Sequence, residues 1–191
     1  QSATPRRLLQ KTFSLASANI GVCADLAEQM VELGADRQST RVIRNGVDLQ
    51  RFSVVDRGEA RKHLGIEHPG LLLLSVGNLI ELKGHHLIIR MLKDLPEAQL
   101  VIVGSGPMRE ELEQLAASLG LADRVRFAGQ QANESLKYWF SAADALMLAS
   151  SREGWANVLL EAMASGTPVV ATRVNGTPEV VAAPDAGRLR S

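Results

Sequence analysis

The amino-acid sequence predicts an α/β fold in which a Rossmann-like parallel sheet carries helices on both faces. Short apolar segments alternate with segments of helical spacing, which is the pattern of βα units joined by right-handed crossovers. The segment 71–76 is a nearly continuous apolar run, as a central parallel strand is. Turns containing glycine follow the apolar segments that end at Val76, Val103, Ala128 and Ala149. Ligands of such sheets bind at the carboxyl ends of the strands, so these turns mark the expected binding edge.

The N-terminal part of the chain predicts two helices and two short strands. Leucines and a phenylalanine recur at helical spacing in 6–18, and Gly34 ends the helical pattern of 25–33. Short strands are expected at 19–23 and 41–44, where Asn45-Gly46 ends the second. The basic side chains of 6–18 could touch an acidic membrane surface, although a solvated helix start explains them as well.

The main part of the chain predicts six strands and six helices. A glycine follows several of the helical segments, as it does at many helix C-termini. The expected strands are 71–76, 99–103, 125–128, 145–149, 168–172 and one that begins at 187–189. The expected helices are 59–64, 85–95, 108–119, 134–142, 157–165 and one that begins at 177–181.

Composition excludes several classes of function. Lysine plus arginine and aspartate plus glutamate both number 21, so the balance gives no support for a nucleic-acid partner. Cys23 is the only cysteine, so no internal disulfide can form, and we expect a buried, inert thiol. No apolar run approaches the ~20 residues of a membrane span, and the four histidines lack a metal-ligand spacing. A cytoplasmic location is expected, with peripheral contact at the inner face of the membrane left open.

Two carboxylates in the stretch 150–170 need an explanation. Glu153 sits in the turn where a strand ends, and Glu161 lies eight positions later inside a helix. Helical side chains lean toward the N-terminus, so the Glu161 carboxylate can reach the mouth of the same turn. Free N–H groups at 154–156, with the helix dipole behind them, suit a phosphate. Alternatively, Glu153 is an ordinary acid of a first helical turn and Glu161 a solvated side chain.

Two other turns at the same edge could contact an anion. Lys83 lies in the loop 77–84 that follows the first strand of the sheet, and its charge could neutralise a diphosphate; an exposed surface lysine is the alternative. The Gly104-Ser-Gly-Pro107 turn fits either close approach to a ligand or tight packing of a strand against a helix.

Several motifs together resemble one enzyme family. Its E-x(7)-E motif is followed by A-x-A-x-G-x-P-V-V, which residues 153–170 match. In order along the chain, the family's N-G-V-D-x-x-x-F, G-x(5)-K-G, V-G-x-G-P, V-x-F-x-G and G-x-P-E stretches match at 45–52, 77–84, 103–107, 125–129 and 176–179. Over roughly 43–181 the chain therefore resembles the retaining, nucleotide-sugar-dependent glycosyltransferases of the GT-B fold, in group 1 (family four).

The resemblance implies transfer of a sugar from a UDP- or GDP-type donor, with no metal and no other cofactor. Glu161 would accept hydrogen bonds from the ribose hydroxyls and Glu153 would contact the sugar, while Lys83 and the amides at 154–156 would hold the diphosphate. Glu153 and Lys83 are the predicted catalytic residues. The predicted donor-binding residues are Gly77, Asn78, Lys83, Gly104, Gln130, Glu153, Gly154, Trp155, Ala156, Asn157 and Glu161.

The resemblance also implies a division of the chain. Residues 1–51 are predicted to be the end of an N-terminal domain and the linker, and 52–191 a donor-binding domain that is truncated at its C-terminus. The acceptor would be bound mainly by the missing N-terminal domain, so the fragment alone would be inactive. One departure weakens the match: Asn78 stands where many members carry an arginine that binds the diphosphate. A GT-B nucleotide-sugar epimerase and a non-catalytic nucleotide-binding or scaffold module therefore stay open.

Six side chains receive secondary expectations. Gln130 and Gln131 are candidate contacts to the nucleotide base. Trp155 either walls a sugar pocket or packs over the glycine turn. Glu179 is expected to cap a helix rather than to bind a ligand, and the His85-His86 pair is expected at the surface.

Overall fold

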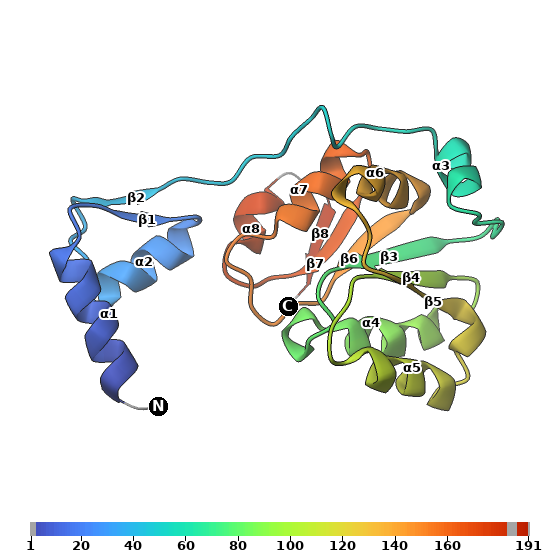
Figure 1. The fold of residues 1–191 in the computed structure, drawn as a ribbon, viewed down its shortest axis with the longest axis horizontal. Helices are drawn as coiled ribbons and strands as arrows, with labels where there is room; N and C mark the ends of the chain where they lie inside the picture. Colours follow the sequence, from blue (N-terminus) through green and yellow to red (C-terminus); the bar gives the residue numbers. More distant parts are fainter. Residues whose placement is uncertain (1–2, 183–186, 191) are drawn as a thin grey trace.

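The computed structural model describes residues 3–182 and 187–190. Its main part is a parallel sheet of six strands in the order β5-β4-β3-β6-β7-β8 (Figure 1). The strands are β3 (Leu72–Val76), β4 (Gln99–Val103), β5 (Val125–Gly129), β6 (Ala145–Leu148), β7 (Val169–Thr172) and β8 (Gly187–Arg190). The predicted Rossmann-like class is confirmed, and strand order reverses between β3 and β6.

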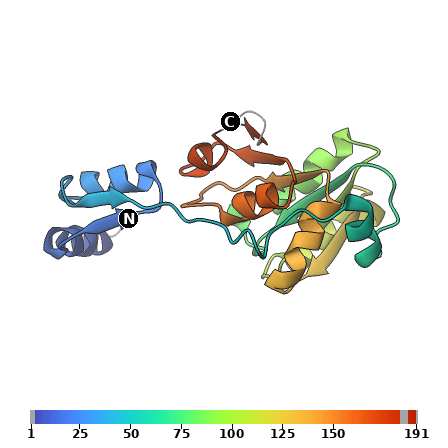
Figure 2. The ribbon, with the colours of Figure 1, turned by 90° about the horizontal axis from the view of Figure 1, so that it is seen from above.

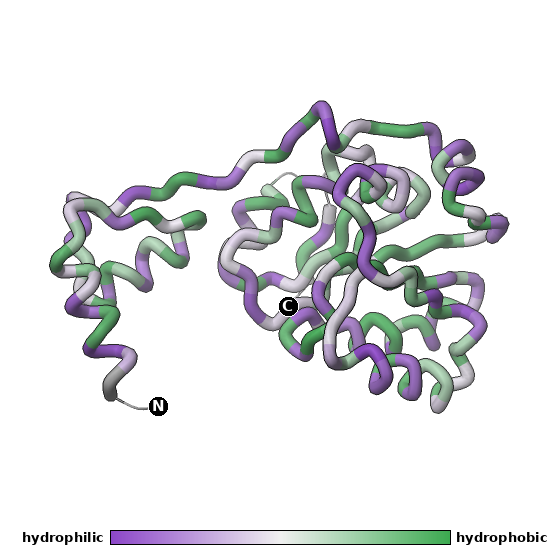
Figure 3. Tube along the Cα trace, viewed as in Figure 1, coloured by the Kyte–Doolittle hydropathy of each residue, from purple (hydrophilic) through white to green (hydrophobic). Residues whose placement is uncertain are grey.

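Helices cover both faces of this sheet. One face carries α4 (His85–Met91) and α5 (Arg109–Ser118), and the other carries α3 (Arg57–His63), α6 (Asn133–Ala142) and α7 (Asn157–Ala164). Alternation along β3 explains the two layers: Leu72 and Leu74 join the core under α6 and α7, while Leu73 joins the core under α4 and α5. Figure 3 shows hydrophobic residues along the central strands. A short helix, α8 (Thr177–Val180), follows β7.

The N-terminal segment forms a separate small unit. It contains α1 (Ala3–Leu15), β1 (Asn19–Gly21), α2 (Ala24–Glu32) and β2 (Thr40–Val42), and β1 pairs with β2 in parallel. An extended connection leads from β2 to α3, and Figure 2 shows the unit standing beside the sheet. Cys23 is buried as predicted, and its Sγ accepts a hydrogen bond from the Leu26 N–H at the start of α2 (3.5 Å). The proposed domain boundary near residue 51 stays a prediction.

The helix expected over 85–95 is shorter than predicted. It ends at Met91, and Leu92–Asp94 forms a 3-10 turn instead. Pro96 explains the difference, because a proline disfavours helical backbone in the residue before it, here Leu95. Arg124 stabilises the turn from across the fold. Its guanidinium donates to the carbonyls of Leu92 (2.8 Å), Leu95 (2.7 Å), Pro96 (2.8 Å) and Ala98 (3.2 Å).

We expect Arg124→Ala to lower the free energy of unfolding by about 1–3 kcal/mol, because the variant leaves partly buried carbonyls without their donor. Urea titration followed by circular dichroism measures this. Lys93→Ala is the matched control, since Lys93 lies exposed in the same turn. Equal midpoints for the two variants would show that Arg124 does not hold the turn.

Candidate functional site

A pocket of about 330 Å³ lies at the carboxyl ends of β3 and β6. These are the neighbouring strands at which the strand order reverses, the usual place for a ligand in an open α/β sheet. The loop after β3 supplies one wall, and the turn after β6 with the start of α7 supplies the other. The lining residues are Val76, Gly77, Asn78, Lys83, Glu153, Trp155, Ala156, Asn157, Val158 and Glu161.

Four hydrogen bonds hold Glu153 in place, and in one of them its carbonyl oxygen accepts from the Gly176 N–H (3.4 Å). The side chain is buried, and its Oε1 accepts from Lys83 Nζ (2.6 Å) and from Ser150 Oγ (2.7 Å). The Glu153 N–H donates to Asn175 Oδ1 (3.3 Å). A carboxylate fixed in this way beside a lysine is oriented before a ligand arrives. The two predicted catalytic residues therefore form an ion pair in the pocket.

Glu161 lies in the second turn of α7 and lines the same pocket as Glu153. It is half-buried, and burial raises the pKa of its carboxyl group. The positive charge of Arg51 has the smaller, opposite effect on this pKa. This position does not fit the alternative of a solvated surface side chain. No side chain caps the start of α7, where Ala156 and Asn157 line the pocket. In the first turn of α7, the N–H groups of Asn157 and Leu159 donate to the carbonyls of Trp155 and Ala156 (both 3.0 Å). Val158 also lines the pocket, and the helix dipole favours an anion at this end of α7.

Three predicted donor-binding residues do not line this pocket. A Cβ on Gly104 would lie 1.9 Å from the Gly77 carbonyl oxygen, so this glycine permits close packing of two loops. Gln130 follows β5, and its Oε1 accepts from Ser105 Oγ (3.4 Å). A Cβ on Gly154 would lie 3.3 Å from Leu26 Cδ1, so Gly154 is turned toward α2. Their predicted roles in donor binding stay predictions.

His85 is buried, not at the surface, so that prediction is wrong. Only 2% of the residue is exposed, because the first residue of α4 packs directly on β3. Its Nδ1 lies 2.9 Å from Ser75 Oγ and its Nε2 3.2 Å from the Asn78 carbonyl oxygen. Nε2 therefore carries the proton and donates to the carbonyl, and Nδ1 accepts from the hydroxyl. A serine within an otherwise apolar strand was the available signal, since a buried hydroxyl needs a partner.

Stability is expected to fall on acidification because of His85. Burial lowers the pKa of His85, and the nearby Lys83 charge acts in the same direction. As the pH falls through about 6.5, the unfolded chain takes up a proton on this residue that the folded chain does not, and folding becomes less favourable. Thermal unfolding between pH 7.5 and 5 should show a smaller drop in Tm for His85→Gln than for the unmodified chain. Parallel curves for the two proteins would contradict the buried, neutral assignment.

The Glu179 side chain bonds to residues outside its own helix. It lies in the first turn of α8, but its Oε1 accepts from the Ala24 N–H, the first N–H of α2 (2.7 Å), and its Oε2 pairs with Arg44. The expectation of a helix cap is thus met at the N-terminus of a distant helix. Sequence reasoning also missed Ser150 and Asn175 as partners of Glu153, because both contacts depend on the folded turn.

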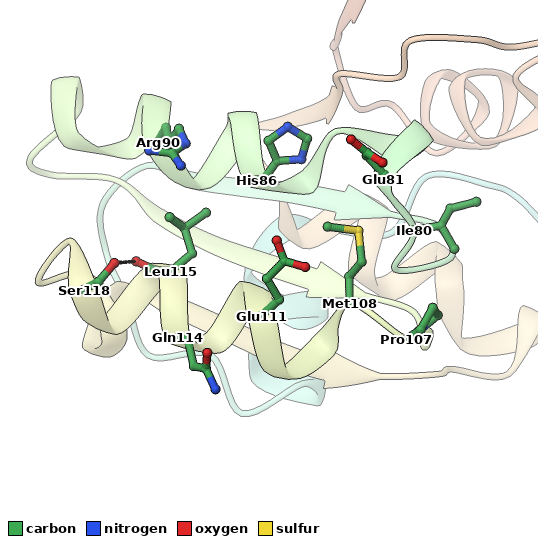
Figure 4. Close-up of a pocket in the computed structure, with 10 residues that line it drawn as sticks. All are labelled: Ile80, Glu81, His86, Arg90, Pro107, Met108, Glu111, Gln114, Leu115 and Ser118. Carbon is green, nitrogen blue, oxygen red and sulfur yellow. Dashed lines mark hydrogen bonds between the residues drawn. The ribbon is translucent and has the colours of Figure 1, made fainter.

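The largest of the described cavities lies elsewhere. It measures about 700 Å³ and runs between α4 and α5 (Figure 4). Its charged side chains include Glu81 and Glu111 as well as Arg90, and none of the predicted donor-binding residues lines it. We therefore place the candidate site in the smaller pocket, which combines a lysine, two carboxylates and a helix N-terminus.

The described residues contain neither a metal-binding cluster nor a membrane-spanning helix. Residues 3–182 and 187–190 contain no group of three or more histidine, cysteine, aspartate or glutamate side chains that could hold a metal ion. Within the same residues, none of the helices has the length and apolar character that a membrane crossing requires.

Solved structures resemble this fold closely. Anabaena Alr3699/HepE, crystallised with UDP and glucose, is 28% identical with a TM-score of 0.88, and the match covers 100% of this chain and 54% of that one. Sucrose-phosphate synthase from Thermosynechococcus elongatus is 29% identical with a TM-score of 0.89, over 99% of this chain and 49% of that one.

Relatives found by sequence comparison are also glycosyltransferases. A D-inositol 3-phosphate glycosyltransferase of Geodermatophilus obscurus is 43% identical over an alignment of 167 residues, and the match covers 80% of this chain and 37% of that protein. The chain thus spans about half the length, or less, of the relatives it matches. The family model described as "Glycosyl transferases group 1" matches residues 56–189. The chain, with the Rossmann-like architecture of one half of a GT-B enzyme, belongs to the group 1 glycosyltransferase family.

Proposed function

We propose that this chain is the donor-binding part of a glycosyltransferase that moves a sugar from a nucleoside diphosphate sugar to an acceptor with retention of anomeric configuration. The observation that carries the proposal is the convergence of Glu153, Glu161 and Lys83 on one pocket beside the uncapped start of α7. A nucleotide sugar has hydroxyl groups for the carboxylates and a diphosphate for the cation and amides.

Each side chain has a distinct role in this proposal. Glu161 accepts hydrogen bonds from the ribose hydroxyls, which suits a carboxylate in a half-buried wall. The amides at the start of α7 and Lys83 Nζ hold the diphosphate. Glu153 contacts the transferred sugar, and Asn78, which also lines the pocket, donates hydrogen bonds where many family members carry an arginine.

The chemistry needs stabilisation of the charge that develops on the departing nucleoside diphosphate. Lys83 and the α7 dipole supply positive charge at that position without reorganising. Lys83 is paired with Glu153, so a diphosphate in the pocket shares this lysine with a fixed carboxylate. We propose that the chain's own groups perform this role with no metal ion. The acceptor is bound mainly by the part of the longer protein that precedes this chain.

Isothermal titration tests the proposal on the chain itself. Titration with UDP, GDP and their glucose or mannose derivatives should show weak binding of one nucleotide series, and the UDP complexes of the HepE neighbour make uridine the first choice. No transfer is expected, because the chain spans about half the length, or less, of the relatives it matches. Robust transfer by this chain alone, or no binding of any nucleotide, would contradict the proposal. Product analysis with the full-length protein separates a transferase from an epimerase.

A further inference from the structure

We propose that Asn175 positions Glu153 by linking its backbone to Asp25 in the N-terminal segment. The inference rests on the proposed function in that Glu153 contacts the sugar of the donor. Asn175 lies in the turn between β7 and α8, where its φ of 40° is in the left-handed region that asparagine tolerates. The side chain is thereby directed across the turn rather than along it.

The Asn175 amide spans two elements that are far apart in the sequence. Its Oδ1 accepts from the Glu153 N–H (3.3 Å), and its Nδ2 donates to Asp25 Oδ2 (2.8 Å). Asp25 is in the first turn of α2, and the same Oδ2 accepts from Gln29 Nε2 (2.8 Å). One side chain therefore connects the backbone of a pocket residue with α2, the helix that joins the parallel strands β1 and β2.

Close packing keeps these parts together. A Cβ on Gly176 would lie 2.3 Å from the Gly154 carbonyl oxygen and 3.1 Å from Cys23 Cβ, so the turn after β7 fits between the Glu153 turn and the start of α2 only because this residue is glycine. The carboxylate of Glu179 adds a second connection, to the Ala24 N–H. The link through Asn175 is thus one part of a contact with several independent supports.

The consequence for the site is that α2 helps to set the position of Glu153. Ser150 and Lys83 fix Oε1 of the side chain. The backbone from which it projects is held by Asn175 and by the Gly176 N–H, which donates to the Glu153 carbonyl (3.4 Å). Loss of the link lets the Glu153 turn shift while Glu161 and Lys83 stay where they are. The contact to the sugar should weaken, and the contacts to the nucleotide should not.

The test compares UDP with UDP-glucose, and GDP with GDP-mannose, by isothermal titration of the chain and its variants. Asn175→Gly removes the side chain but keeps the left-handed backbone, and Asp25→Ala removes the far partner. In both variants the affinity for the nucleotide sugar should fall about three- to tenfold, while the affinity for the nucleoside diphosphate stays unchanged. Glu28→Ala is the matched control, because Glu28 lies on the same helix and pairs with Arg37 instead.

Hydrogen exchange of the Glu153 amide reports directly on its hydrogen bond to Asn175 and needs no ligand. Both variants should speed its exchange, and the control should not. Unchanged exchange, or an equal loss of affinity for the nucleotide and its sugar derivative, would overturn the positioning role. If the unmodified chain binds no nucleotide, the proposed function is overturned, and with it the role of Asn175 toward the sugar. Hydrogen exchange of the Glu153 amide would then be the test of whether Asn175 holds the Glu153 backbone.

Discussion

Glu161→Ala is expected to weaken nucleoside diphosphate binding by about a hundredfold or more. In the proposed complex the carboxylate accepts from two ribose hydroxyls, and hydrogen bonds to a charged group contribute about 1.5–3 kcal/mol each. Isothermal titration of the chain with UDP measures the loss. Glu110→Ala is the control, because Glu110 is an exposed acid in the first turn of α5.

The protonation state of Glu161 adds a second signature. Burial raises the pKa of this carboxyl group, and the protonated form loses acceptor strength. Nucleotide affinity should therefore decline on acidification at a higher pH than an ordinary glutamate would cause. Because burial disfavours the charged form, Glu161→Ala should also be no less stable at neutral pH than the unmodified chain. Unaltered nucleotide binding in this variant would point to a scaffold module.

Lys83→Met is expected to reduce both stability and diphosphate affinity. Lys83 and Glu153 are 25% and 9% exposed in their side chains, so the variant leaves a largely buried carboxylate without its cation. Breaking such a pair costs about 3 kcal/mol. The diphosphate loses a point charge as well, so the preference of the chain for UDP over UMP should shrink.

A double-mutant cycle separates these two effects. Lys83→Met combined with Glu153→Gln should recover most of the lost stability, because no unpaired charge remains, but it should not recover the preference for UDP. Urea titrations of the four proteins give the coupling energy, and titrations with UDP and UMP give the preference. Additive losses of stability would mean that the ion pair does not hold the pocket.

The sequence predicted the sheet because its strands alternate with helices and end in glycine turns. The placement of Glu153 and Glu161 at one pocket was also accessible, since both lie within one βαβ unit and a helical side chain leans toward the N-terminus of its helix. Local spacing relates residues only when a regular element or a short turn connects them. That condition holds for the wall of the pocket formed by the turn after β6 and by α7.

Contacts between distant segments lay beyond such reasoning. His85 looked like a surface residue because its partner Ser75 belongs to another element. Asn175 and Asp25 are separated by 150 positions, so no periodicity connects them. In each case tertiary packing, and not local propensity, decided the outcome.

A crystal structure of this chain with UDP-glucose, or with the sugar nucleotide that titration selects, tests the account most directly. We expect the ribose hydroxyls at Glu161, the diphosphate between Lys83 and the first turn of α7, and the sugar beside Glu153. Nucleotide bound in the cavity between α4 and α5, with the pocket at the ends of β3 and β6 empty, would contradict it.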